Sequence, residues 1–267
     1  MLIAELLGGS ALIAAPSAPV PPRSAVPAPA PLVVGDGRTV RLISLGGELT
    51  DGLLTRVAGD IGDAVAAVEK FWGTDWDREI VIIATGSQQE FLAQAGLDPN
   101  RQWQDIAAVS VADHVDLAHH RASGQRMVFA PGAAAMSDQS LRIVLTHELF
   151  HLAARADTAL DAPRWLVEGV ADFVARPATP LPPGAAADTA LPTDADLDAA
   201  GPQRVRGYDR AWWFARFVAD SYGVDALRRL YIEACGPGHG DFETAVHRAL
   251  NTDTAALRAR WAQWLTG

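Results

Sequence analysis

The sequence predicts an α+β fold in which a small mixed β-sheet is followed by a series of helices. Three observations support this prediction. Apolar, β-branched runs typical of strands are confined to the first half of the chain, and the segments after Pro131 repeat their apolar residues at helical spacing. The chain has 267 residues, of which 49% are hydrophobic, so it is long enough to bury a substantial core.

The sheet-rich part is expected to span residues 36–135. Its side chains alternate in polarity at the start, which predicts a half-buried strand, and a long amphipathic helix follows. Further apolar runs predict three more strands. A short helix is expected directly after the strand at 78–85. The expected strands are 39–45, 78–85, 105–111 and 126–132, and the expected helices are 51–72 and 87–96.

The helical part is expected to span residues 136–267 and to form one domain with the sheet-rich part. Apolar periodicity predicts helices at 138–155, 163–175, 208–222, 224–234, 241–249 and 253–265. Residues 176–202 interrupt this series with six prolines and almost no large apolar side chains. We interpret them as a long surface excursion, which is either a functional lid or a disordered loop.

The N-terminal 35 residues differ in composition from the rest. Residues 1–15 are apolar like the core of a signal peptide, although Glu5 interrupts them and no lysine or arginine precedes them. Residues 16–31 contain seven prolines, which favours an extended tether. A truncated export signal would explain both features, so we predict a secreted or membrane-tethered protein outside the cytoplasm, with a cytoplasmic location as the alternative.

The charge and cysteine content exclude several classes of function. The chain has 22 lysines and arginines against 32 aspartates and glutamates, a net charge of −10, and no basic cluster that could follow a phosphate backbone. We therefore expect no nucleic-acid partner. Cys235 is the single cysteine, so the chain can form neither an internal disulfide nor a thiolate metal cluster. Any metal must be held by histidines and carboxylates.

The segment "HELFH" places two histidines four residues apart on a predicted helix. A helix turns about 100° per residue and rises about 1.5 Å, so His147 and His151 project from one face roughly 6 Å apart and can converge on one ion. Glu148 is offset by one residue, which leaves its carboxylate near the open coordination position as a general base. With seven histidines in the chain, this pattern is expected by chance only about 0.006 times.

The alternative is a core helix without a metal, in which the two imidazoles hydrogen-bond internally and Glu148 pairs with an arginine such as Arg142. Burying these groups among leucines would be costly unless each found a partner. A metal would satisfy them together, which favours the metal site.

A catalytic zinc ion commonly has three protein ligands and an open position. Residues 161–177 offer the third ligand on a predicted helix that begins near Pro163 and ends before Pro177. On that helix Glu168 and Asp172 are four residues apart on a common face. The alternative is that both are solvated charges.

These residues resemble the gluzincin metallopeptidases, and among them the peptidase MA-like group. The resemblance rests on "HELFH" and on "WLVEGVADF" at 165–173, is close over residues 141–175, looser towards the C-terminus, and unspecific over residues 1–100. It implies a thermolysin-like catalytic fold that binds one zinc ion through His147, His151 and Glu168, with Glu148 as general base. It also implies that Asp172 orients a ligand histidine.

The sequence thus predicts a zinc-dependent endo- or aminopeptidase that acts on peptide or protein substrates. Its competitors are a gluzincin-fold binding or scaffold protein without turnover, and a metal-dependent hydrolase of a non-peptide amide or ester. Zinc suits two imidazoles and a carboxylate, although cobalt and manganese share this ligand chemistry.

Further residues are candidates for a role at the site. Tyr208 is our first choice as the hydrogen-bond donor to the oxyanion, with helix bracing as the alternative. Arg206 could bind a substrate carboxylate or be a solvated loop arginine. His119 and His120 are expected in a surface loop. The strand at 126–132 is either the sheet edge that pairs with an extended substrate or an interior strand.

Overall fold

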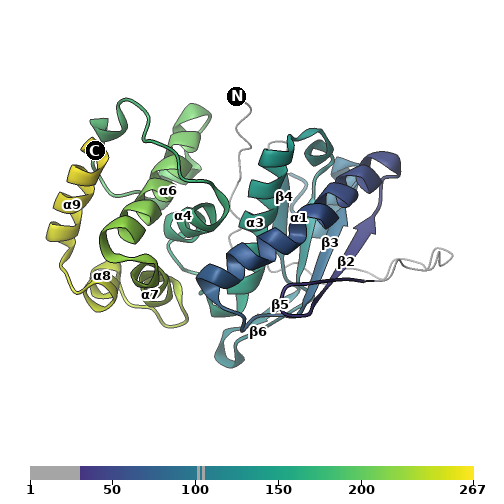
Figure 1. The fold of residues 1–267 in the computed structure, drawn as a ribbon, viewed down its shortest axis with the longest axis horizontal. Helices are drawn as coiled ribbons and strands as arrows, with labels where there is room; N and C mark the ends of the chain where they lie inside the picture. The colour runs from purple at the N-terminus through teal and green to yellow at the C-terminus, as the bar shows by residue number, and fades with distance from the viewer. Residues whose placement is uncertain (1–30, 101–102, 104–105) are drawn as a thin grey trace. The chain divides into compact units, whose positions relative to one another are not determined.

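The computed structural model describes residues 31–100, 103 and 106–267, and the chain divides into two compact units, one ending at Ala156 and the other running from Asp157 to Gly267. The predicted α+β class is confirmed (Figure 1). The signal-like segment and most of the proline-rich tether lie outside the described residues. Among the helices that the structure describes, none combines the length and the apolar character needed to cross a membrane.

The first unit is built on a five-stranded mixed sheet with the order β1-β2-β3-β7-β4. The three central strands are parallel, and the edge strands β1 and β4 are antiparallel to their neighbours. A separate antiparallel pair is formed by β5 and β6. The strands are β1 (Leu32–Val34), β2 (Arg38–Ser44), β3 (Glu79–Ala84), β4 (Ala108–Val111), β5 (His114–Asp116), β6 (Arg121–Ser123) and β7 (Arg126–Phe129).

Helices cover both faces of this sheet. The alternation along the strands sends Ile83, Val109 and Val128 to the face covered by α2 (Gln88–Ala95), where they form an apolar cluster with Phe91. The opposite face lies beneath α1 (Glu48–Trp72) and α3 (Asp138–Ala154), which pack against each other. The sheet therefore supports α3, the helix that carries the HELFH segment, on the face opposite α2.

The second unit is helical. Its helices are α4 (Arg164–Ala175), α5 (Asp194–Asp198), α6 (Pro202–Tyr222), α7 (Val224–Cys235), α8 (Phe242–Leu250) and α9 (Thr254–Thr266). Aromatic rings form the centre of its core. Phe214 contacts Trp165, Phe217 and Trp261 with ring centroids 5.1 to 5.8 Å apart. These contacts join α4, α6 and α9.

Two glycines allow the helices of this unit to approach closely. A Cβ atom on Gly169 of α4 would lie 2.4 Å from the Ala211 carbonyl oxygen of α6, so only glycine fits there. A Cβ atom on Gly207 would lie 2.6 Å from the Asp196 carbonyl oxygen of α5. Tertiary packing therefore compensates for the low helix propensity of both glycines.

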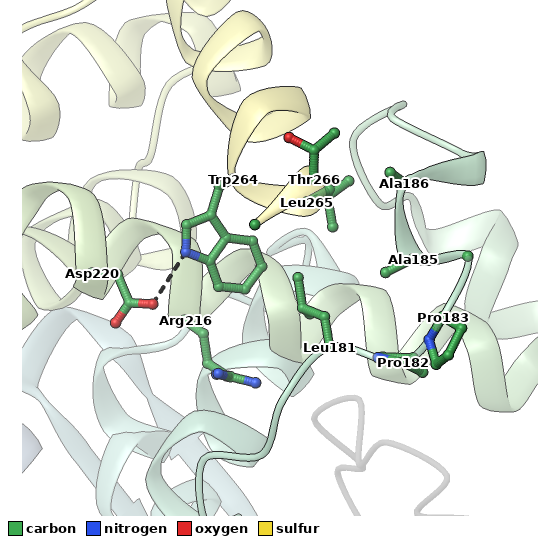
Figure 2. Close-up of a pocket in the computed structure, with 12 residues that line it drawn as sticks. Leu181, Pro182, Pro183, Ala185, Ala186, Arg216, Asp220, Trp264, Leu265 and Thr266 are labelled. Atoms are coloured by element: carbon green, nitrogen blue, oxygen red, sulfur yellow. Dashed lines mark hydrogen bonds between the residues drawn. The ribbon is translucent and has the colours of Figure 1, made fainter.

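The proline-rich excursion is attached to the helices of its own unit. Arg216 donates to the Thr179 carbonyl oxygen, and the buried guanidinium of Arg210 pairs with Asp188. The Trp261 indole N–H donates to the Ala190 carbonyl oxygen at 3.2 Å. A cavity of about 730 Å³ lies between this excursion and α9. Its lining residues include Arg216 and Trp264 (Figure 2).

The structure also corrects several predicted boundaries. The expected strand 126–132 ends at Phe129, because Pro131 begins a 3₁₀ helix that runs to Ala135. The expected helix 208–222 begins six residues earlier, at Pro202, since Gly207 is packed inside it. The short elements β1, β5, β6 and α5 were not predicted.

We predict that Gly169→Ala destabilises the protein by about 1–3 kcal/mol, because the added methyl group forces α4 and α6 apart. The matched control is Gly59→Ala in α1, where an added Cβ meets no atom within 4 Å. That substitution should stabilise by about 0.5–1 kcal/mol through helix propensity. Urea unfolding followed by circular dichroism measures both changes, and equal stabilities of the two variants would contradict the close packing at Gly169.

Candidate metal centre

Local sequence signals and burial define α3, the helix that carries the first two predicted ligands. The Ser137 side chain caps its N-terminus by accepting a hydrogen bond from the Ser140 backbone N–H at 3.2 Å, and Asp138 lies in its first turn. Every residue from Val144 to Ala154 is buried. A helix buried on all sides is an unusual place for two histidines and a glutamate.

His147 and His151 point to a common place, as the spacing predicts. Their Nε2 atoms are 3.0 Å apart, and their ring centroids are separated by 4.7 Å. The two residues are 1% and 4% exposed. Two imidazole nitrogens on one tetrahedral zinc ion would be separated by roughly 3.3 Å, so only a small movement is needed to admit a metal between them.

The same helix positions Glu148 firmly. The Ser110 hydroxyl of β4 donates a 2.7 Å hydrogen bond to the Glu148 backbone carbonyl, and the Arg155 guanidinium donates to the Ser110 carbonyl at 2.7 Å. All three residues are at least nine-tenths buried. The edge strand and the end of the helix therefore fix the backbone at Glu148.

The alternative partner for Glu148, Arg142, lies elsewhere. Its guanidinium donates a 2.9 Å hydrogen bond to the Asp60 carboxylate of α1, and this ion pair is half-exposed. The carboxylate raises the pKa of Arg142 above its ordinary value. Arg142 is therefore engaged by Asp60 and does not serve as the example of a partner for Glu148 in the core-helix interpretation.

Glu168 and Asp172 lie one turn apart on α4 and are 0% and 1% exposed. They are not solvated charges. Arg176, at the end of the helix, donates to Asp172 Oδ2 at 3.1 Å and to Asp209 Oδ1 at 2.9 Å. Burial lowers the pKa of Arg176, but the two carboxylates more than offset this effect and raise the pKa above its ordinary value.

His147, His151 and Glu168 form a group that could hold one metal ion. All three are buried, and one ligand atom from each lies within 4.8 Å of the other two. Two imidazoles and a carboxylate are a donor set that zinc uses in catalytic sites, so the residues fit the predicted ion. The described residues offer no second group of this kind among histidine, cysteine, aspartate and glutamate.

The remaining candidate residues from the sequence analysis differ in how deeply they are buried. Tyr208 is half-buried on α6, close enough to Arg164 of α4 for the two side chains to interact electrostatically. Arg206 is exposed and lines a cavity of about 440 Å³. His119 and His120 are exposed as expected, and the His119 ring lies 2.8 Å from Asp116.

The strand at 126–132 is not the sheet edge, since β7 lies between β3 and β4. The edge strand next to β7 is β4, and all four of its residues are buried. Sequence reasoning also missed Ser110 and Arg176. The spacing of four residues between Asp172 and Arg176 could have indicated the second, whereas the contact of Ser110 spans 38 residues and has no local signal.

We predict that the purified protein binds one zinc ion per chain. At a zinc concentration 100-fold above Kd, binding should raise the free energy of unfolding by about 2.7 kcal/mol. Glu168→Gln should weaken zinc binding at least about a hundredfold by removing a ligand, whereas Glu243→Gln on the exposed surface of α8 should not change it. Metal analysis and thermal unfolding test this, and equal affinity of the two variants would exclude Glu168 as a ligand.

No protein-family model matches the chain, and no curated protein matches it. What the structure supports is a buried group of His147, His151 and Glu168 on two helices. At this level the site is consistent with zinc binding.

Proposed function

We propose that the protein is a zinc-dependent peptidase of gluzincin type. The observation that carries the proposal is the buried group of His147, His151 and Glu168, together with Glu148 directly after the first histidine. A purely structural zinc site has four protein ligands and no need for an adjacent buried carboxylate. The three-ligand set leaves a coordination position for a water molecule and the substrate.

The two histidines and Glu168 would hold the ion, with Asp172 supporting them from the outer shell. A bound zinc ion would supply Lewis-acid chemistry, lowering the pKa of a water molecule towards about 7 and polarising the substrate carbonyl. The chain itself must then supply proton transfer, orientation and stabilisation of the developing negative charge.

Glu148 is assigned the proton transfer. Its carboxylate accepts the proton of the attacking water and passes it to the nitrogen of the leaving amine as the peptide bond breaks. The support for this role is its place in the HELFH segment and its 1% exposure, since a buried carboxylate is shielded from bulk solvent. The hydrogen bond from Ser110 to its backbone keeps this residue in place between steps.

Tyr208 is assigned the stabilisation of the oxyanion. Its phenol would donate a hydrogen bond to the carbonyl oxygen as negative charge develops there. Its support is a half-buried position on α6 and a hydroxyl donor of suitable chemistry. Tyr208→Phe should lower kcat more than it changes KM if this assignment holds.

The proposed substrate is a peptide or protein, and the proposed location is outside the cytoplasm. The location is supported by the apolar residues 1–15 and the proline-rich residues 16–31, which together suit an export signal or a membrane tether. The net charge of −10 supports the absence of a nucleic-acid partner.

Glu148→Gln tests the proposal directly. We predict that the variant keeps its zinc and loses at least about a hundredfold in kcat/KM on a peptide library, because the amide cannot accept the proton. Glu79→Gln, on the exposed surface of β3, is the control and should cleave like the wild type.

The outcomes separate the competing functions. Cleavage of esters but not of peptides by the wild type would favour a hydrolase of non-peptide substrates. Zinc binding without any turnover would favour the scaffold protein. Peptide cleavage that survives Glu148→Gln unchanged would exclude the proposed mechanism.

A further inference from the structure

A cavity of about 440 Å³ lies within the second unit, between the proline-rich excursion and the N-terminal half of α6. Its size falls within the range of about 300–1,000 Å³ that is typical of small-molecule sites. Pro182, Val205 and the buried Trp213 provide apolar walls, and two arginines and two aspartates provide charged groups. None of the residues of the candidate metal group lines this cavity. It is therefore a separate candidate site.

The two aspartates of the cavity are each paired with an arginine. The guanidinium of Arg210, a residue that is 6% exposed, donates to the Asp188 carboxylate and to the Ala190 carbonyl oxygen. Asp209 accepts a 2.9 Å hydrogen bond from Arg176. Because a guanidinium contacts each carboxylate, the negative charge of both aspartates is offset.

Arg206 is the remaining charged residue of the cavity, and it is exposed. Of the residues that the structure describes, none forms a hydrogen bond or an ion pair with its guanidinium. The cavity also borders Pro202, the first residue of α6, where the helix dipole favours an anion. The cavity therefore carries one uncompensated positive charge at its solvent-facing side.

We propose that this cavity binds a small organic molecule with a single carboxylate, which Arg206 holds while the apolar walls contact the rest of the molecule. A guanidinium can donate two parallel hydrogen bonds to a carboxylate. A monoanion matches the one uncompensated charge, whereas the second charge of a phosphate dianion would be repelled by Asp188 and Asp209. The Trp213 ring suits an aromatic or aliphatic substituent. This binding site goes beyond the proposed peptidase function.

The competing explanation is a water-filled cavity beside a solvated arginine. A solvated arginine attracts every anion weakly, and salt screens that attraction. A ligand site instead binds one molecule per chain and requires both the carboxylate and the apolar part of the ligand. Saturation and selectivity therefore separate the two explanations.

Isothermal titration calorimetry of the zinc-loaded full chain with 4-phenylbutyrate tests the proposal. We expect one molecule to bind per chain with a Kd on the order of 1 mM or tighter. The neutral 4-phenylbutanamide, which has the same apolar part, should bind at least about tenfold more weakly. Arg206→Met should weaken 4-phenylbutyrate binding at least about tenfold as well. Arg258→Met, which removes an exposed arginine of α9 outside the cavity, is the matched control and should leave binding unchanged.

Equal binding of the acid and the amide would overturn the proposal, as would an Arg206→Met protein that binds 4-phenylbutyrate like the wild type. Failure to saturate at about ten times the expected Kd would also overturn it. Because a carboxylate can bind zinc directly, the titration is repeated after a chelator has removed the metal and circular dichroism has verified the fold. Loss of binding in that protein would assign the carboxylate to the metal centre and overturn the proposal. Since the readout is binding, a protein without peptidase activity would refute the proposed function and leave this test intact.

Discussion

The burial of polar and ionisable groups in an apolar interior is the constraint on which this structure depends. His147, Glu148 and His151 lie on a helix in which every residue from 144 to 154 is buried, and Glu168 is completely inaccessible. Removing such groups from water costs several kcal/mol unless they are hydrogen-bonded, paired or bound to a metal. A divalent cation would offset the cost for two imidazoles and a carboxylate at once. The metal hypothesis thus explains why these residue types occupy core positions.

The framework around these residues suits a site that must keep its geometry. In the first unit, the sheet supports α3 from one side, and β4 is joined to the Glu148 backbone through Ser110. In the second unit, Gly169 lets α4 pack directly on α6, and Arg176 fixes the end of α4 to the same helix. Each helix that carries a candidate ligand is therefore held within its own unit by contacts that involve no atom of the candidate metal group. Such preorganisation lets a site bind its metal without reordering the chain.

The sequence predicted those structural features that depend on the local spacing of apolar residues. The long helices and the three parallel strands follow from apolar spacing, and the convergence of His147 and His151 follows from their i, i+4 placement. Three-residue strands such as β1 and β5 are too short for such a signal. The first six residues of α6 were missed because Gly207 argues against a helix locally, while its contact with Asp196 is made by tertiary packing.

For the candidate site, prediction from the sequence was again limited by contacts between residues that lie far apart in the chain. Arg142, the arginine named as a partner for Glu148 in the core-helix interpretation, pairs instead with Asp60, 82 residues away. Ser110 reaches Glu148 across 38 residues, and neither contact has a signature in the local sequence. Residue chemistry and helical spacing could therefore name the candidate ligands, whereas the residues that support them required the folded chain.

X-ray absorption spectroscopy at the zinc edge tests most directly whether His147, His151 and Glu168 hold a zinc ion. For protein reconstituted with one equivalent of zinc, we predict two imidazole nitrogens at about 2.0–2.1 Å and oxygen ligands at about 2.0–2.2 Å. His151→Ala should reduce the imidazole scattering to a single ring. A wild-type spectrum with no imidazole in the coordination shell, or one that His151→Ala leaves unaltered, would contradict this prediction.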